Sequence, residues 1–155
     1  MKGNTDLIPE ELYKEIHKNV PIACVDILVE HDGKFLMTKR TNAPAKGEWW
    51  FPGGRVLKNE TLLDAAKRKL KEETGLVAED MKILGVDETF FPDGPFGGDT
   101  HTINIVFLAE VSDISSFVLD TQSSEAKWFD TIDEMWNPYL KKFAMFAKQE
   151  ETKRQ

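Results

Sequence analysis

The stretch that decides the fold is GGRVLKNETLLDAAKRKLKEETGL, residues 53–76, which begins with two glycines and ends just after a Glu-Glu pair. Its apolar residues recur at the spacing of one helix face, and Thr61 precedes them as a residue typical of a helix N-cap. Gly75 follows them, at the position where glycine commonly ends a helix. The pattern therefore predicts an amphipathic helix over 61–74.

The last turn of this predicted helix carries two adjacent carboxylates, Glu72 and Glu73, beside its apolar face. Neighbouring side chains are about 100° apart around a helix axis, so these two flank one polar edge. Carboxylates placed together near a core repel each other unless a cation or an arginine offsets their charge. Magnesium takes such oxygen ligands, and the Gly53-Gly54 turn lets a backbone carbonyl come close. The segment predicts a Mg²⁺ site, with Mn²⁺ as the alternative ion.

A solvated helix with ion pairs one turn apart would explain the charges alone, but not the glycines or the upstream Glu60. Arg68 lies one turn before Glu72, where it is able to orient that carboxylate. Lys69 puts a positive charge where such a site would use a further carboxylate. We expect it to retune the site, leaving one tightly bound ion and an amine available to a phosphate oxygen or to Glu73.

The rest of the chain alternates strand and helix patterns, which indicates an α/β fold with a mixed sheet covered by helices on both faces. Strands are expected over 22–30, 34–40, 48–54, 82–91, 101–111 and 126–129, and further helices over 8–19 and 131–149. The first two strands read as a hairpin across the turn HDGK. No repeat or linker divides the chain, so residues 1–155 are expected to form one domain.

Two local details complete this prediction. Thr131 and Glu134 have the spacing of a capping box for the last helix, which Pro138 is expected to break or kink. The Gly- and Pro-rich loop at 91–101 is interpreted either as a lid over a substrate site or as a plain connection.

The overall charge favours a small phosphate-bearing ligand over nucleic acid. The formal net charge is −7, whereas nucleic-acid binders usually present a basic face. Three of the four arginines, however, lie within residues 40–68, and guanidinium groups contact phosphate bidentately. No signal peptide or membrane-spanning run is expected. The single cysteine, Cys24, excludes an intramolecular disulfide and fits a reducing cytoplasm.

The order of residues in this stretch resembles the Nudix box, from Gly54, Glu60 and Arg68 through Leu70, Glu72, Glu73, Gly75 and Leu76. Only the glutamate after the arginine is replaced, by Lys69. The resemblance implies an α/β/α sandwich and Mg²⁺-dependent hydrolysis of a nucleoside diphosphate linked to another moiety. It implies that Glu72, Glu73 and the carbonyl of Gly53 hold the metal, and that Glu60 and Arg68 are catalytic residues.

Residues 8–66, which include KRTNAPAKGEWWFPGGRVLKNETL, are also similar to the GDP-mannose mannosyl hydrolases, a Nudix branch that releases GDP by cleavage at the sugar carbon. This similarity implies that Arg40 and Arg55 contact the diphosphate, where they would stabilise charge on the leaving group. It also implies a homodimer in which residues 1–20 form a dimerisation arm, and a metal ligand at Gln122.

The late loop of this chain departs from that branch. The branch has a histidine base directly after its glutamine, and here that place is taken by Ser123, a poor base at neutral pH. Glu125 instead resembles the late-loop glutamate that binds metal or activates water in Nudix pyrophosphatases.

Three interpretations of the function remain open. The first is hydrolysis of a nucleotide sugar or another nucleoside diphosphate derivative at the phosphoanhydride, with Arg40, Arg55 and Lys69 as substrate-binding residues. The second is a GDP-sugar glycosyl hydrolase whose base is Glu125 or His101. The third is a catalytically weak domain that binds a nucleotide or a partner. The intact metal-binding pattern argues against the third, and Ser123 argues against the second.

Overall fold

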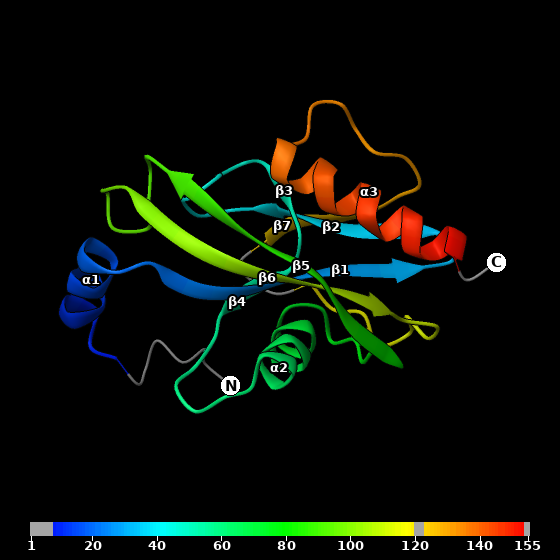
Figure 1. The fold of residues 1–155 in the computed structure, drawn as a ribbon, viewed down its shortest axis with the longest axis horizontal. Coiled ribbons are helices and arrows are strands. Elements are labelled where there is room, and N and C mark those ends of the chain that lie inside the picture. The colour runs from blue at the N-terminus through cyan, green and yellow to red at the C-terminus, as the bar shows by residue number, and fades with distance from the viewer. Residues whose placement is uncertain (1–7, 120–122, 154–155) are drawn as a thin grey trace.

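Seven strands and three helices make up the described part of the chain, residues 8–119 and 123–153, in the computed structural model (Figure 1). In chain order they are α1 (Glu10–Asn19), β1 (Ile22–His31), β2 (Lys34–Arg40), β3 (Trp49–Trp50), β4 (Gly53–Arg55), α2 (Leu62–Thr74), β5 (Asp80–Phe91), β6 (Thr100–Glu110), β7 (Ser123–Phe129) and α3 (Pro138–Lys153).

The strands form one mixed sheet in the order β3-β2-β1-β6-β5, with β4 also paired to β1 and β7 to β2. β1 and β6 run parallel, with Cys24 opposite Asn104, and the other pairs are antiparallel. Asp32 and Gly33 both have positive φ, which suits the tight turn between β1 and β2. The predicted hairpin and the mixed sheet are therefore confirmed.

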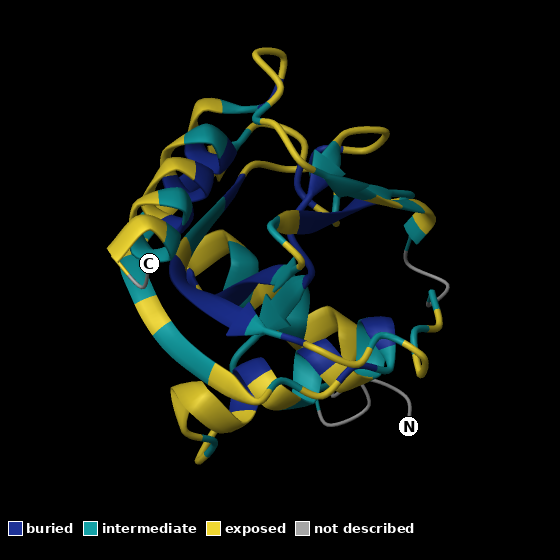
Figure 2. Ribbon diagram, turned by 90° about the vertical axis from the view of Figure 1, so that its right-hand side faces the viewer, coloured by how far each residue is buried: buried dark blue, intermediate teal, exposed yellow. Residues whose placement is uncertain are grey.

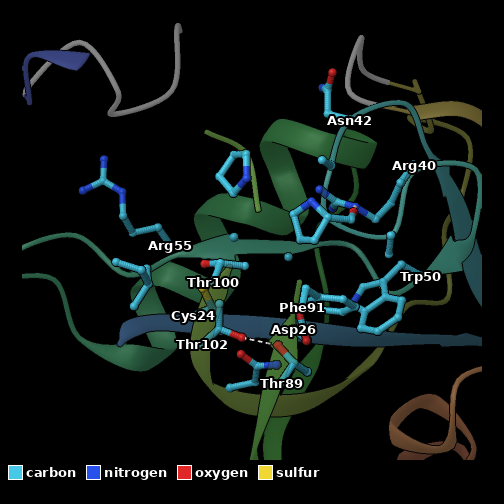
Figure 3. A pocket seen from close by; sticks show the side chains of 18 of the residues that line it. Cys24, Asp26, Arg40, Asn42, Trp50, Arg55, Thr89, Phe91, Thr100 and Thr102 are labelled. Atoms are coloured by element: carbon cyan, nitrogen blue, oxygen red, sulfur yellow. Dashed lines mark hydrogen bonds between the residues drawn. The ribbon is translucent and has the colours of Figure 1, made fainter. Parts of the chain in front are cut away.

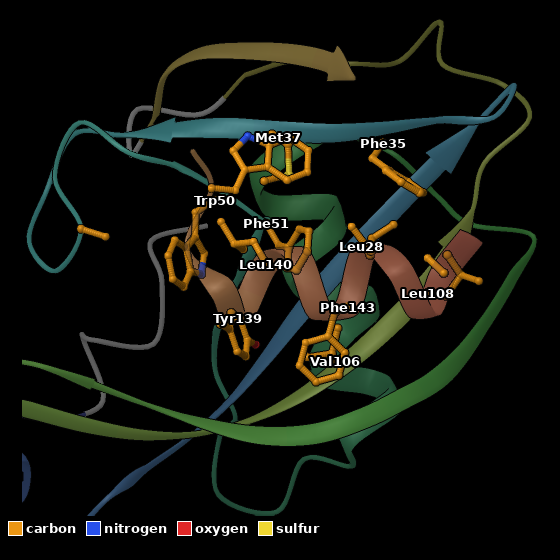
Figure 4. Packing of buried hydrophobic residues seen from close by; sticks show 14 residues of the cluster. Leu28, Phe35, Met37, Trp50, Phe51, Val106, Leu108, Tyr139, Leu140 and Phe143 are labelled. Carbon is orange, nitrogen blue, oxygen red and sulfur yellow. The ribbon is translucent and has the colours of Figure 1, made fainter. Parts of the chain in front are cut away.

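Helices α2 and α3 cover opposite faces of this sheet (Figure 1). Because side chains alternate along a strand, β1 contributes to both sides: Val25, Ile27 and Val29 pack with α2, whereas Leu28 packs with α3. Figure 4 shows Phe143 of α3 packed on the same side of the sheet as Leu28. In Figure 2 the buried residues lie on the strands and on the helix sides that face them. The predicted sandwich is confirmed.

The helix that carries the box-like pattern forms where the sequence predicts it. The hydroxyl of Thr61 accepts a hydrogen bond of 3.1 Å from the backbone N–H of Asp64 and so caps α2. Gly75 ends the helix with φ of 71° and donates its N–H to the carbonyl of Lys71. Ala65, Ala66 and Leu70 are buried against the sheet, so the polar edge of the helix is fixed in place.

The predicted bounds of three elements are wrong, and the smallest error is in the strand expected over 126–129, which begins at Ser123. The last helix begins at Pro138 instead of 131, because the Asn137 side chain caps it by accepting from the N–H of Tyr139 at 2.9 Å. Proline is well suited to this first helical position, so Pro138 begins the helix, and the break or kink predicted there is wrong. The single strand expected over 48–54 is two strands, β3 on β2 and β4 on β1, separated by Phe51 and Pro52.

Candidate active site

The glycine turn and the last turn of α2 face each other across a short distance. The backbone N–H of Gly53 donates to Oε2 of Glu73 at 2.9 Å, and Gly53 pairs with Asp26 in the neighbouring strand. A β-carbon at position 53 would lie 2.3 Å from Oδ1 of Asp26 and 2.4 Å from the carbonyl oxygen of Val25. Only glycine lets β4 lie between β1 and the carboxylates of α2.

Arg68 connects three separate parts of this site. Its guanidinium donates to both carboxylate oxygens of Glu60, at 2.7 and 3.0 Å, and to the carbonyl of Arg55 at 2.9 Å. It also reaches Oε2 of Glu72 at 3.3 Å. The hydrogen bond from Arg68 lowers the pKa of Glu60, and the same contact raises the pKa of Arg68. Both groups are charged at neutral pH, and the structure places Glu60 where it positions Arg68.

The ammonium of Lys69 lies between the two adjacent carboxylates. Nζ is 3.4 Å from Oε2 of Glu72 and 3.4 Å from Oε1 of Glu73. The methylene stem runs beneath Gly54, where a β-carbon would lie only 2.5 Å from Cε of Lys69. The two carboxylates therefore already converge on one cation, and that cation is a side chain.

The shared contact of Glu72 and Glu73 with one ammonium indicates whether these two carboxylates could hold a metal ion. Carboxylate oxygens that share one cation are suitable donors for a hard divalent ion, so Glu72 and Glu73 fit Mg²⁺ provided that Lys69 moves aside. Within residues 8–119 and 123–153, no three His, Cys, Asp or Glu side chains gather as a metal centre. The predicted ligand Gln122 lies outside the described residues.

A pocket of about 470 Å³ lies on the other side of β4 (Figure 3). Arg40 and Arg55 stand on opposite sides of it, and Asp26, Thr89 and Thr102 lie below them. Its aromatic lining comes from α1, the β3–β4 segment and the end of β5: Tyr13, His17, Trp50, Phe51 and Phe91. The segment 42–45, between β2 and β3, lines it as well. Gly53 and Gly54 line it too, so β4 separates the pocket from the α2 carboxylates.

Two polar groups in this pocket have no hydrogen-bond partner within the described part of the chain. They are Oδ1 of Asn104 and Nε2 of His17, both buried. His17 is oriented by a contact of 3.1 Å between its Nδ1 and the hydroxyl of Thr100, and burial lowers its pKa. Leaving a buried polar group unpaired costs about 1–3 kcal/mol, which makes both groups natural contacts for a ligand.

Asp26 is the charged group at the floor of the pocket. Its carboxylate accepts hydrogen bonds from the hydroxyl of Tyr139 and from the indole of Trp50. Burial raises its pKa to about 6. Burial also raises the pKa of the neighbouring Cys24 thiol to about 12, so this cysteine is neutral.

The structure brings most of the predicted site residues together, in two groups. Arg40, Arg55 and Gly53 line the pocket, and the box residues of α2 lie behind β4. Glu125 on β7 does not line the pocket: it is 59% exposed and lies 3.8 Å from the amine of Lys39. The catalytic role of Glu125 stays a prediction.

The alternative base His101 is also outside the pocket lining, where it pairs with Glu88 and stacks on Phe90. The loop at 91–101 contributes Phe91, Pro95 and Thr100 to the pocket wall. Of these, Phe91 and Thr100 are the end residues of β5 and β6, and Pro95 lies in the loop between the two strands. Both interpretations of this loop, a lid and a plain connection, stay predictions.

Three pocket residues were missed from the sequence: His17, Asp26 and Asn104. Asp26 and Asn104 each interrupt an apolar run, IACVDILV and TINIVFLA, and a polar residue within a buried strand is a usable signal. His17 lies on an amphipathic surface helix and gives no such signal.

In the described ranges, no helix is long and apolar enough to cross a bilayer.

Comparison with known proteins identifies the family. A family model for the NUDIX domain matches residues 18–148. Low-salt glycan biosynthesis protein Agl8 of Haloferax volcanii is 36% identical over 141 residues, 90% of each chain. The ADP-ribose pyrophosphatase of Methanocaldococcus jannaschii is 39% identical over 110 residues, 71% of this chain and 62% of that protein. A solved MutT protein from Methanosarcina mazei Go1 has a TM-score of 0.67 at 26% identity, covering 85% of this chain and 97% of that one. The chain therefore belongs to the Nudix hydrolase family, as the pattern at residues 54–76 indicated.

Proposed function

We propose that this protein is a Mg²⁺-dependent hydrolase that cleaves nucleoside diphosphate derivatives, in particular nucleotide sugars, at the phosphoanhydride. The observation that carries the proposal is the arrangement across β4. A pocket with an arginine on each side lies on one side of this strand, and two converging carboxylates lie on the other. A diphosphate held beside β4 would lie between its binding groups and the metal ligands.

Each part of the site has a separate task in this proposal. Glu72, Glu73 and the Gly53 carbonyl would hold the ion, which when bound supplies Lewis acidity and a more acidic water. Arg68 keeps Glu72 in place through the contact of 3.3 Å. Arg40 and Arg55 neutralise charge on the diphosphate as the bond breaks.

The pocket floor suits the organic part of such a substrate. Trp50 and Phe91 offer aromatic surface with ring centroids 5.6 Å apart, and Asn104 offers an unpaired acceptor. Nucleobases and sugars both carry N–H or O–H donors that such an acceptor can bind. The named activity of the Methanocaldococcus jannaschii relative, ADP-ribose pyrophosphatase, supports cleavage within the diphosphate.

A second candidate is cleavage at the sugar carbon with release of the nucleoside diphosphate. The specific observation in its favour is His17, a pocket imidazole whose lowered pKa keeps it neutral. Neutral imidazole is suited to act as a general base. The name of the Haloferax volcanii relative, a glycan biosynthesis protein, fits a sugar-linked substrate in either case.

The products distinguish the two candidates. The purified protein is incubated with Mg²⁺ and GDP-mannose or ADP-ribose in ¹⁸O water, and the products are separated by ion exchange and weighed by mass spectrometry. Phosphoanhydride cleavage gives a nucleoside monophosphate and a sugar phosphate, with ¹⁸O on one phosphate. With GDP-mannose, whose sugar is joined through its anomeric carbon, cleavage at carbon gives unlabelled GDP and free mannose, which would overturn the proposal in favour of the second candidate.

A matched pair of variants tests the site itself. Glu73→Gln should lower kcat/KM by roughly 100-fold, since loss of a residue that only supports a metal ligand already costs about 10–100-fold. Glu79→Gln should leave activity unchanged, because Glu79 is an exposed carboxylate bonded to Ser112. Equal activity of both variants, or no turnover of any nucleoside diphosphate derivative, would contradict the proposal.

We also propose that residues 1–155 form one domain, since α1, α2 and α3 all contact strands of the same sheet. The predicted homodimer and the role of residues 1–20 as a dimerisation arm are kept as proposals. The supporting observation is that α1 exposes Leu12, and Val20 directly after it, two apolar side chains that a partner chain would cover. Sedimentation at several protein concentrations tests the dimer.

A further inference from the structure

We propose that Lys69 is a built-in cation of the carboxylate pair: its ammonium balances charge that a divalent ion would otherwise balance. The site is thereby assembled without metal and binds fewer ions than it would with a carboxylate at this position. The inference rests on the metal site of the proposed function, and it is independent of which substrate is cleaved.

The geometry around the ammonium is that of a shared cation. Nζ is 3.4 Å from an oxygen of Glu72 and 3.4 Å from an oxygen of Glu73. The side chains of the three residues are only 14–20% exposed, so solvent screens these contacts less than it screens surface pairs. A solvated helical ion pair would instead join one lysine to one exposed carboxylate, as Lys18 and Glu15 do with exposures of 70% and 61%.

The lysine stem is also held in place by the strand above it. A β-carbon at position 54 would lie 2.5 Å from Cε, 3.0 Å from Cδ and 3.1 Å from Nζ of Lys69. Gly54 therefore makes the room that the stem occupies, and the same residue lines the pocket. The ammonium thus lies beside the backbone that faces the substrate, and its position depends on β4.

The charge count around α2 explains why a cation is needed here. The cluster contains three carboxylates, Glu60, Glu72 and Glu73, against the two cations Arg68 and Lys69, which leaves it one charge negative. A glutamate at position 69 would leave it three charges negative, and a methionine two. Like charges this close repel unless ions are bound, so each replacement should make the fold depend on divalent metal.

Counting bound ions tests the inference without any substrate. Mn²⁺ binding is titrated by electron paramagnetic resonance on the wild type, on Lys69→Glu and on Lys67→Glu. The last variant makes the same charge change at an exposed position of the same helix. Lys69→Glu should bind at least one more Mn²⁺ per chain than the wild type, and Lys67→Glu should bind the same number as the wild type. Equal numbers for all three proteins would overturn the inference.

Thermal unfolding in EDTA and in Mg²⁺ gives a second readout, and Lys69→Met is included because it keeps the stem and removes only the charge. The wild type should gain some stability from Mg²⁺, because the ion binds its folded state, but it should gain less than either Lys69 variant. The loss of melting temperature in EDTA should be larger for both Lys69 variants than for the wild type by roughly 4 °C or more, a readily measured difference for a chain of this size. Equal EDTA sensitivity of wild type and Lys69→Met would also overturn the inference.

The result is separable from the fate of the proposed function. A wild type that binds no Mn²⁺ beside a Lys69→Glu variant that does would support the role of Lys69 and contradict Mg²⁺-dependent hydrolysis. A catalytically active wild type that binds as many Mn²⁺ ions as Lys69→Glu would support Mg²⁺-dependent hydrolysis and contradict the role of Lys69.

Discussion

Replacing Glu60 with glutamine removes one charge from the pair that fixes Arg68 and leaves a side chain of equal size. The guanidinium donates to both oxygens of Glu60, at 2.7 and 3.0 Å, and the two side chains are 17% and 13% exposed. Hydrogen bonds between charged groups contribute about 1.5–3 kcal/mol each, and the glutamine oxygen can still accept one of the two. We expect Glu60→Gln to lower the free energy of unfolding by about 2 kcal/mol.

A double-mutant cycle with Arg68→Met measures the pair itself. Urea unfolding of the wild type, both single variants and the double variant should give a coupling energy of about 1.5–3 kcal/mol. The exposed pair Lys14–Glu11, in which Glu11 is 87% exposed, is the matched control and should give less than about 0.5 kcal/mol. A coupling for Glu60–Arg68 no larger than that of the control would refute the structural argument.

The same variant has an expected kinetic signature. Arg68 also contacts the Arg55 carbonyl and Glu72. A less firmly held Arg68 should therefore disturb the proposed metal ligand Glu72 more than it disturbs the substrate pocket. We expect Glu60→Gln to lower kcat with little change in KM. A change in KM alone would indicate that Glu60 acts on substrate binding instead.

Three further predictions concern the sheet and its core. Because burial raises the pKa of Asp26 to about 6 from an ordinary value of 3.8, the folded state binds the proton more tightly. Asp26 should therefore cost the wild type about 3 kcal/mol as pH rises from about 4 to 6, and Asp26→Asn should flatten urea-unfolding profiles over that window. Gly53→Ala should abolish turnover and lower the melting temperature, since its β-carbon would overlap a backbone oxygen of β1, whereas Gly98→Ala has open space and should do neither. Phe143→Ala, at a side chain 1% exposed, should cost about 3–5 kcal/mol in calorimetry, clearly more than Phe146→Ala at a position 37% exposed.

Helix α2 could be predicted from the sequence because everything that defines it is local. Its cap at Thr61, its end at Gly75 and its apolar face lie within one stretch of the chain. The residues that gather at its last turn, Arg68 to Glu73, are neighbours on one helix and needed no tertiary information to be placed together.

Two of the wrong boundaries, those of the last helix and of the stretch at 48–54, have physical reasons that a local pattern does not contain. Thr131 and Glu134 satisfy a capping rule, but Asn137 and Pro138 satisfy a better one, since proline lacks the N–H that an interior helical position needs. The stretch at 48–54 has suitable residues for one strand, and only its pairing with two different partners, β2 and β1, divides it.

The pocket could not be predicted because its residues meet through the parallel pairing of β1 and β6. Asp26 and Asn104 are far apart in the sequence, and the register that sets Cys24 opposite Asn104 brings them to the same floor. His17 reaches the site from α1 through its contact with Thr100. The local sequence marks Asp26 and Asn104 only as polar residues within apolar strands and does not mark His17, and only the sheet order makes the three residues neighbours.

The short strand β4 explains why the charged half and the pocket half of the site are coupled. Its N–H at Gly53 binds Glu73, its carbonyl at Arg55 binds Arg68, and its glycines line the pocket. A displacement of this backbone must therefore move a carboxylate of the cation site and a wall of the substrate pocket together. Because β4 is itself held between β1 and α2 without room for a side chain at position 53, the core of the fold positions β4 and the carboxylates bound to it.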